Sequence, residues 1–200
     1  YNEITRFGNL EKVISGIKEA IKNKIKIKIN TVAIKDFNEN ELEELILWTD
    51  KNHIDITFIE VMPMEETDIG RHMQFLPLDK VHQKLNDKFN FKKIDHNTGG
   101  PAIYYSGDNI SNKVGFITPI TNNFCANCNR VRITSTGKLF MCLGQNDHVD
   151  FRDILRNDYS NEYIKEKISY AMKIKPKKHD FLIDEKTKPY MQRHMNVTGG

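Results

Sequence analysis

The sequence has little of what marks a secreted, membrane-spanning or nucleic-acid-binding protein. Three of its 200 residues are cysteines, an odd number that disulfides cannot fully pair, and it contains no secretory leader. No apolar run approaches the length of a membrane span. The formal net charge is only +3, and no basic stretch is interleaved with aromatic residues. We therefore expect a soluble protein of the cytoplasm, with no membrane and no nucleic acid among its partners.

Length sets a limit on the number of domains. Two hundred residues can bury a sizeable core, and they suit one large domain or two small ones. The chain opens at Tyr1 rather than at a methionine, and a helical pattern follows almost at once. We expect it to be a piece of a longer protein.

All three cysteines lie within residues 124–143, where Cys125, Cys128 and Cys142 form the pattern C-x2-C-x13-C. Two thiolates at the first spacing can chelate one metal centre from a tight turn, and a third can close the site after a hairpin. A cubane iron–sulfur cluster held by three cysteines leaves one iron open for a small molecule. The alternative is a structural zinc ribbon in which His148 is the fourth ligand.

The first third of the chain alternates helices and strands. Residues 9–22 carry apolar side chains at helical intervals, and Asn9 is placed to cap that helix. Residues 24–34 alternate apolar with polar, which predicts a strand with two unlike faces. A second helix over 40–52 and a second strand over 54–62 follow. This order predicts an α/β fold with a parallel sheet.

The pattern changes after Pro63. Residues 65–71 are polar and predict a connecting loop, and helical spacing resumes over 76–89. We place a domain boundary near residues 64–76.

A hairpin is expected between Cys128 and Cys142, with its turn at residues 135–138. It explains the thirteen-residue gap, because it returns the third cysteine beside the first two. Arg130 and Arg132 have the same parity on the first strand, so both can point to one side. The alternative interpretation of these arginines is a solvated face.

Helices are also expected over 150–156 and 160–174, and the basic run 173–179 follows them. Cations suit the carboxyl end of a helix, so a solvated helix end is the default interpretation of this run. A patch for RNA or an acidic partner is the alternative.

The cysteine stretch, FCANCNRVRITSTGKLFMCL, resembles the carboxyl-terminal cluster motif of the GTP 3′,8-cyclase family, the molybdenum cofactor biosynthesis protein A group of radical S-adenosylmethionine enzymes. Three further stretches match in the same order: IKINTV at 27–32, FIEVMP at 58–63, and the terminal residues 198–200. These matches spread over nearly the whole chain. One departure is Thr57, where the family commonly has arginine.

The resemblance implies a particular architecture and set of cofactors. Residues 1–70 would be the last part of an incomplete (βα)6 TIM-like barrel, and residues 71–200 an α+β region that binds a 4Fe–4S cluster and GTP. Cys125, Cys128 and Cys142 would hold that cluster, whose open iron faces GTP. The intact protein would carry a second 4Fe–4S cluster and S-adenosylmethionine.

The resemblance also assigns roles to single residues. Those that would bind GTP are Lys28, Arg130, Val131 and Arg132. Arginine suits a nucleotide because its planar donor fork makes paired hydrogen bonds to phosphate. Met62 would contact S-adenosylmethionine, and Gly199 and Gly200 would reach into the active site, where residues without side chains can approach a ligand closely.

The implied reaction is that of a lyase, which converts GTP to (8S)-3′,8-cyclo-7,8-dihydroguanosine 5′-triphosphate by radical chemistry. Its functional partner would be the next enzyme of the pathway, cyclic pyranopterin monophosphate synthase, and the protein would be a monomer or homodimer. The printed sequence contains no C-x3-C-x2-C motif, so we expect this chain alone to be inactive. The alternatives are a zinc-ribbon binding module and another radical S-adenosylmethionine enzyme with an auxiliary cluster.

Overall fold

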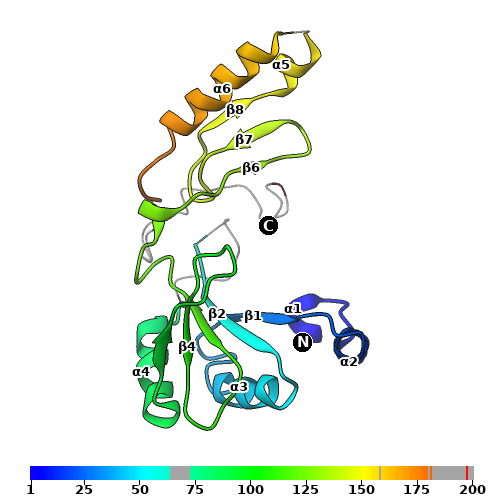
Figure 1. The fold of residues 1–200 in the computed structure, drawn as a ribbon, viewed down its shortest axis with the longest axis vertical. Helices are drawn as coiled ribbons and strands as arrows, with labels where there is room; N and C mark the ends of the chain where they lie inside the picture. Colours follow the sequence, from blue (N-terminus) through cyan, green and yellow to red (C-terminus); the bar gives the residue numbers. More distant parts are fainter. Residues whose placement is uncertain (64–72, 158, 180, 182–196, 198–200) are drawn as a thin grey trace. The chain divides into compact units, whose positions relative to one another are not determined.

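The computed structural model describes residues 1–63, 73–157, 159–179, 181 and 197 (Figure 1). The chain divides into two compact units. The first unit comprises residues 1–32, 40–59 and 82–117, and the second comprises 33–39, 60–81 and 118–200. The expected split between residues 70 and 71 falls outside the described residues.

A five-stranded mixed sheet forms the centre of the first unit. Its strands, in spatial order, are β1 (Lys28–Ala33), β2 (Asp55–Glu60), β5 (Val114–Ile117), β4 (Ile103–Ser106) and β3 (Lys92–Ile94). β2 and β5 run parallel, whereas β4 is antiparallel to both β5 and β3. The chain is therefore a mixed α/β protein, as the alternation of helices and strands predicts.

Helices α3 (Leu42–Lys51) and α4 (Leu78–Phe89) complete this core (Figure 1). His82 of α4 lies against the sheet, with ring centroids 4.6 Å from Tyr105 and 5.1 Å from Phe116. α4 therefore covers the sheet face that carries these two aromatic residues.

β1 begins later than the sequence pattern predicts. Helices α1 (Asn2–Thr5) and α2 (Leu10–Lys22) precede it, and the Asn9 side chain accepts the Lys12 N–H at 2.9 Å, as expected of a cap. α2 ends in a turn in which the Ile25 N–H donates to the Ala20 carbonyl and Lys24 has a φ of 57°. Because this turn closes the helix, residues 24–27 lie outside the sheet.

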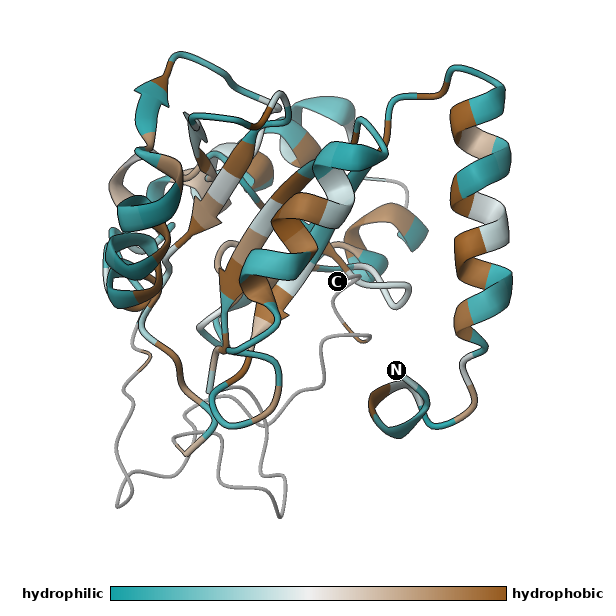
Figure 2. Ribbon diagram, turned by 90° about the horizontal axis from the view of Figure 1, so that it is seen from below, coloured by the Kyte–Doolittle hydropathy of each residue, from teal (hydrophilic) through white to brown (hydrophobic). Residues whose placement is uncertain are grey.

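α2 carries an apolar stripe that the described residues do not bury. Leu10, Val13 and Ile21 are 48%, 40% and 37% exposed. In Figure 2, apolar and polar residues alternate along this helix, which follows the amino terminus. The helix is thus amphipathic, as its sequence predicts.

A row of three residues crosses the middle of the large sheet. Thr57 pairs with Gly115, and Gly115 pairs with Tyr104 on the other side. A Cβ atom at Gly115 would lie 2.9 Å from Thr57 Oγ1 and 2.9 Å from Tyr104 Cε1. Glycine at this position lets the two buried neighbours meet over the central strand.

The described part of the second unit contains a smaller antiparallel sheet and the α-helices α5 and α6. Its strands are β6 (Arg132–Ile133), β7 (Lys138–Phe140) and β8 (His148–Asp150), and its helices are α5 (Arg152–Arg156) and α6 (Asn161–Lys173). The two helices are those expected from the sequence, whereas β8 is not, because three residues are too few to show a period of two. One buried hydrophobic cluster of this unit is formed by Leu139, Met141, Phe151, Ile154 and Ala171.

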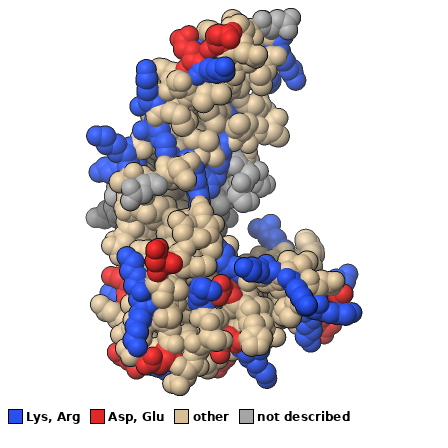
Figure 3. All heavy atoms as spheres, viewed as in Figure 1, with Lys and Arg blue, Asp and Glu red and all other residues tan. Residues whose placement is uncertain are grey.

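The distribution of apolar and charged residues in the structure agrees with the expectations from composition. Among the described residues, no helix has the length and apolar character needed to cross a membrane. On the face seen in Figure 3, lysine and arginine occur in both units with acidic residues among them, so the small net charge hides local concentrations of basic residues.

His82 makes the stability of the protein depend on pH. Burial lowers the pKa of its imidazole, and its Nε2 has no hydrogen-bond partner among the described residues. The folded state therefore disfavours the proton, and the stability present above pH 6.5 is lost as the pH falls below that value.

We expect the free energy of unfolding to fall more steeply between pH 7 and pH 5 in the wild type than in His82→Phe. The difference cannot exceed about 1.4 kcal/mol per pH unit, the limit for one proton. Phenylalanine suits the site, which Phe91, Tyr105 and Phe116 already line. Urea unfolding across this pH range measures the slopes, and equal slopes would contradict the assignment.

Candidate functional site

The first two cysteines lie on one turn of the second unit. Cys125 begins the short 3-10 helix η1 (Cys125–Asn127), and its N–H donates to the Asn123 side chain at 2.7 Å. Cys128 follows the helix, and its N–H donates to the Cys125 carbonyl at 3.0 Å. The C-x2-C spacing is therefore held by local hydrogen bonds.

The hairpin predicted between the second and third cysteines is confirmed. β6 and β7 pair antiparallel with Arg132 opposite Phe140, and Cys142 follows β7 after one residue. Gly137 closes the turn with a φ of 84°, where its missing Cβ would lie 3.0 Å from Arg152 Cβ.

The hairpin is less buried than its alternating sequence suggests. Leu139 is 4% exposed, but Val131 and Ile133 are 40% and 66% exposed. Val131, which the resemblance assigns to GTP, thus lies on an accessible part of the first limb.

The thiol of Cys142 is influenced by the other two cysteines. Burial is the main cause that raises the pKa of the Cys142 thiol, and the nearby Cys125 and Cys128 raise it further. The Gly144 N–H, which donates to Cys142 Sγ at 3.4 Å, and the Lys175 ammonium act in the opposite direction. All three cysteines are among the described residues, and none forms a disulfide.

A complete metal-binding group is not formed by these residues. Across the part of the chain that the structure describes, no three histidine, cysteine or acidic side chains are arranged to hold a metal ion. His148, the ligand of the zinc alternative, packs against Phe140 in a tilted arrangement with ring centroids 4.9 Å apart, and its Nδ1 lies 3.0 Å from the Asn146 carbonyl oxygen.

Arg132 lies beside the cysteines. Its pKa is lowered by burial and then by the charge of Arg130, while Cys128 and Cys142 act to raise it. Arg132 is half-buried and Arg130 is exposed. The shared parity that the sequence shows therefore brings the two cations near one another, with the inner one close to the thiols.

Glu60 connects the end of β2 to the segment that leads into the cysteines. Its carboxylate is 1% exposed and accepts backbone N–H bonds from Ile120 at 2.8 Å, Thr121 at 3.1 Å and Leu78 at 3.2 Å. The Thr121 hydroxyl donates to it as well. Leu78 is the first residue of α4, so one carboxylate fixes a helix start and the approach to the cysteine turn.

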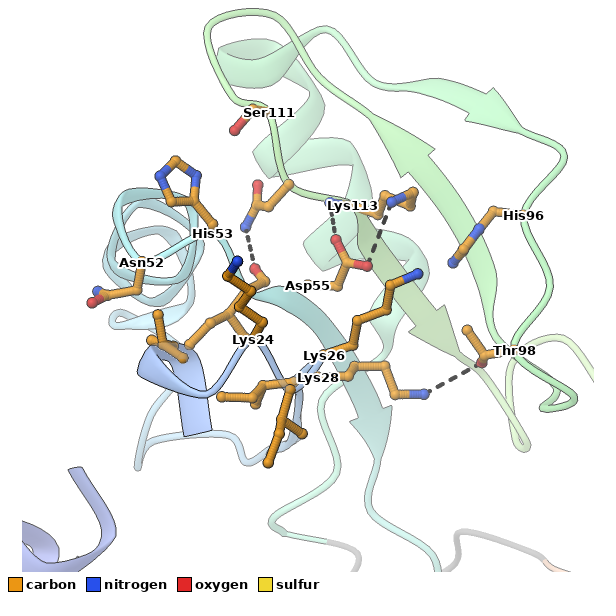
Figure 4. Close-up of a pocket in the computed structure, with 15 residues that line it drawn as sticks. Lys24, Lys26, Lys28, Asn52, His53, Asp55, His96, Thr98, Ser111 and Lys113 are labelled. Atoms are coloured by element: carbon orange, nitrogen blue, oxygen red, sulfur yellow. Dashed lines mark hydrogen bonds and ion pairs between the residues drawn. The ribbon is translucent and has the colours of Figure 1, made fainter. Parts of the chain in front are cut away.

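Lys28, on β1 of the first unit, lines a cavity of about 720 Å³ at the amino ends of β1, β2 and β5 (Figure 4). Its Nζ lies 3.2 Å from the Tyr104 hydroxyl and 3.4 Å from Thr98 Oγ1. Burial acts to raise the pKa of Tyr104, but its hydrogen bonds with Thr98 and the Lys28 charge outweigh burial, so the pKa is lowered.

The cavity is rich in cations that the sequence reasoning assigned to no site. Lys24, Lys26 and Lys113 line it together with Lys28, and Asp55 is the acidic residue among its lining (Figure 4). Asp55 is engaged by Lys113, whose Nζ lies 3.6 Å from it. The sequence signal for Lys26 is its spacing of two residues from Lys28, which places both side chains on one face of an extended chain.

Asn112 adds a buried polar atom to the cavity wall. The residue is 5% exposed, and its amide nitrogen donates to the Thr49 hydroxyl at 2.9 Å and the Ile54 carbonyl at 3.2 Å. Its Oδ1 has no hydrogen-bond partner among the described residues. An unpaired acceptor is therefore buried within the wall of the cavity.

The remaining residues singled out by the resemblance lie elsewhere. Met62 is half-buried, two residues beyond the end of β2. Thr57, where the family commonly has arginine, is fully buried in the sheet and offers no charge. Gly199 and Gly200 lie outside the described residues.

Taken together, the structure defines a mixed α/β protein in which three cysteines and Arg132 lie on or beside one hairpin. Residues 54–181 match the family described as Molybdenum Cofactor Synthesis C, and the chain belongs to this family. The resemblance seen in the sequence is thereby confirmed.

Curated relatives extend the match to the whole chain. Proteins named GTP 3',8-cyclase from Brucella ovis, Brucella canis and Brucella abortus are each 48% identical to it over 201 aligned residues. The alignment covers 100% of this chain and 58% of each relative. The chain thus spans little more than half the length of the relatives it matches.

Proposed function

We propose that this chain is the carboxyl-terminal part of a GTP 3′,8-cyclase of molybdenum cofactor biosynthesis. The observation that carries the proposal is the placement of Cys125, Cys128, Cys142 and Arg132 on and beside one hairpin, in a chain of this family. The reaction would convert GTP to (8S)-3′,8-cyclo-7,8-dihydroguanosine 5′-triphosphate, a radical S-adenosylmethionine reaction of the lyase class. The relatives named for this activity support the assignment.

The proposed architecture follows the order of the chain. Residues 1–70 would be the last part of an incomplete (βα)6 barrel, and β1, α3 and β2 supply the alternation that such a barrel needs. Residues 71–200 would be the cluster-binding and GTP-binding region, which contains the cysteine hairpin.

The cysteines fit a 4Fe–4S cluster in kind, while the described side chains are not drawn together as a complete ligand set. Thiolates are the ligands that iron–sulfur clusters use, and Cys125 and Cys128 lie near enough to Cys142 to raise the pKa of its thiol. The Gly144 N–H already donates to Cys142 Sγ, as backbone amides do to cluster sulfurs. When bound, a cluster held by three cysteines would supply an iron that is open to the guanine of GTP.

The residues of the chain would then bind and orient the nucleotide. In the first unit, Lys28 offers an ammonium group that the Tyr104 hydroxyl holds in place. In the second unit, Arg130, Val131 and Arg132 would contact GTP. Partial burial of Arg132 would strengthen its hydrogen bonds to an anionic ligand. Orientation is the protein's task here, because a ribose radical must reach one ring carbon and not solvent.

Other parts of the proposal concern a protein of the relatives' length. Met62 would contact S-adenosylmethionine, Gly199 and Gly200 would act at the reacting centre, and a second 4Fe–4S cluster would cleave S-adenosylmethionine. The protein would act in the cytoplasm as a monomer or homodimer and pass its product to cyclic pyranopterin monophosphate synthase. We expect the 200-residue chain to bind GTP without cyclising it, because it contains no C-x3-C-x2-C motif.

Anaerobic iron and sulfide analysis tests the proposal. We expect about four irons and four sulfides per chain, with a brown chromophore that changes when GTP is added. Cys142→Ser should lower the iron content to about one or less and remove the GTP response, since two thiolates cannot hold the cluster. Lys28→Met should keep the iron and weaken GTP binding about tenfold, the effect of one charged hydrogen bond.

His148→Ala is the control for the zinc alternative. It should leave iron and sulfide unchanged, since His148 is packed on Phe140. One zinc per chain, no colour, and loss of that zinc in His148→Ala would reject the cluster and favour a ribbon module.

A further inference from the structure

Lys175 reaches from the end of α6 to the base of the cysteine hairpin. Its Nζ lies 2.6 Å from the Met141 carbonyl oxygen, 2.9 Å from the Arg130 carbonyl oxygen and 4.0 Å from Cys128 Sγ. Lys175 is half-buried, whereas Lys177 of the same basic run is exposed. The solvated helix end expected over residues 173–179 is therefore wrong for this lysine.

These three contacts account for every donor of the side chain. A lysine ammonium has three N–H groups and no acceptor. Two of them meet carbonyl oxygens at short distance, and the third can point to the sulfur. An ammonium held in this way is fixed in direction, which is unusual for a side chain with four rotatable carbons.

The two carbonyls belong to opposite limbs of the hairpin. Arg130 lies two residues before β6 begins, and Met141 lies between the end of β7 and Cys142. One cation therefore ties the limb that carries Cys128 to the limb that carries Cys142. Because a carbonyl oxygen is the negative end of a dipole, the tie works without a carboxylate.

The helix that delivers Lys175 is itself anchored. Ala171 of α6 is fully buried in the core formed with Leu139, Met141 and Phe151. The Lys175 N–H donates to the Met172 carbonyl at 3.4 Å, which continues the helix end by one more turn. The position of the ammonium is thus set by packing rather than by chance contact at the surface.

We propose that Lys175 is a positioning residue of the cysteine site. It holds the two cysteine-bearing limbs together, and its positive charge offsets the negative charge that thiolates and a bound cluster bring to the hairpin. The role in cofactor binding rests on the proposed function, whereas the tie between the limbs does not. No aspartate or glutamate forms an ion pair with the ammonium among the described residues, and the side-chain atom that it meets is Cys128 Sγ.

Three variants of the whole chain separate charge from structure. Lys175→Met removes the charge and keeps a stem of similar length, Lys175→Arg keeps the charge, and Lys177→Met is the matched control from the same basic run. Thermal unfolding followed by circular dichroism first shows that each variant is folded. The measurements below compare them with the wild type.

In the iron-free protein, Lys175→Met should exchange amide hydrogens at least tenfold faster in peptides covering residues 125–142, with no change in Lys177→Met. In the reconstituted protein, Lys175→Met should lose iron to a chelator at least tenfold faster. The reduction potential of its cluster should also be about 59 mV more negative, which is a tenfold shift of the one-electron equilibrium, because reduction adds a negative charge. Lys175→Arg should restore the potential.

The outcomes keep the two proposals apart. If the wild type binds no iron and sulfide, the proposed cofactor is rejected, and hydrogen exchange alone decides the role of Lys175. If the wild type binds the cluster but Lys175→Met matches Lys177→Met in exchange, iron retention and potential, the role of Lys175 is rejected. If Lys175→Met changes iron retention but leaves the reduction potential of the cluster unchanged, the tie between the limbs is supported and the charge effect is rejected.

Discussion

Glu60→Ala is expected to lower the free energy of unfolding by about 3–5 kcal/mol, among the largest effects of any single substitution in this chain. The carboxylate is 1% exposed and accepts bonds from three backbone N–H groups and one hydroxyl. Its loss leaves one buried and three partly buried donors without this acceptor, and each unsatisfied buried group costs about 1–3 kcal/mol. Urea unfolding measures the change.

Two further variants give the Glu60 prediction its control. Glu60→Gln keeps the shape and one acceptor oxygen but turns an NH₂ group toward backbone donors, so it should cost about half as much. Glu162→Ala removes an exposed glutamate from the first turn of α6 and should change stability by less than about 0.5 kcal/mol. A loss below about 1 kcal/mol in Glu60→Ala would contradict the role assigned to this carboxylate.

Gly115→Ala is expected to destabilise the protein by about 1–3 kcal/mol, although alanine is the smallest possible addition. The new Cβ would lie 2.9 Å from both Thr57 Oγ1 and Tyr104 Cε1, distances that real Cβ atoms do not show. Thr57 and Tyr104 are 0% and 1% exposed, so neither can move aside into solvent. The sheet must shift instead.

The same substitution elsewhere in the chain should have the opposite sign. Gly16 lies within α2, and a Cβ there would meet no atom within 4 Å. Gly16→Ala should therefore raise the free energy of unfolding by about 0.4–1 kcal/mol, because alanine loses less backbone entropy on folding. If both variants were more stable than the wild type, the close contact of Thr57 and Tyr104 over Gly115 would not explain why position 115 is glycine.

The sequence predicts well those features that depend on neighbouring residues. The cap at Asn9 and the hairpin between Cys128 and Cys142 both depend on residues within one turn or one hairpin of each other, and both are confirmed. β1 is predicted too long, because alternation continues through residues 24–27 while the turn after α2 takes those residues out of the sheet.

Sequence patterns do not predict the contacts that join distant parts of the chain. Glu60 is an ordinary acidic residue at a strand end until the fold brings it to Thr121, 61 residues away. Lys175 stands in a basic run like any solvated helix end, and only the structure places it beside Cys128. Lys113 lines the same cavity as Lys28, 85 residues earlier in the chain, and no sequence pattern links the two. Hydrophobic periodicity cannot reveal such contacts, because it records only which face is buried.

The sequence distance between Cys128 and Lys175 has a consequence for synthesis. The two residues are 47 positions apart, so a ribosome adding 5–20 residues per second needs roughly 2–9 seconds to pass from one to the other. During this interval the first two thiols have been synthesised, but the lysine that ties the limbs has not. The hairpin is therefore complete in sequence before its cation is, and the tie can form only after α6 has been made and has packed.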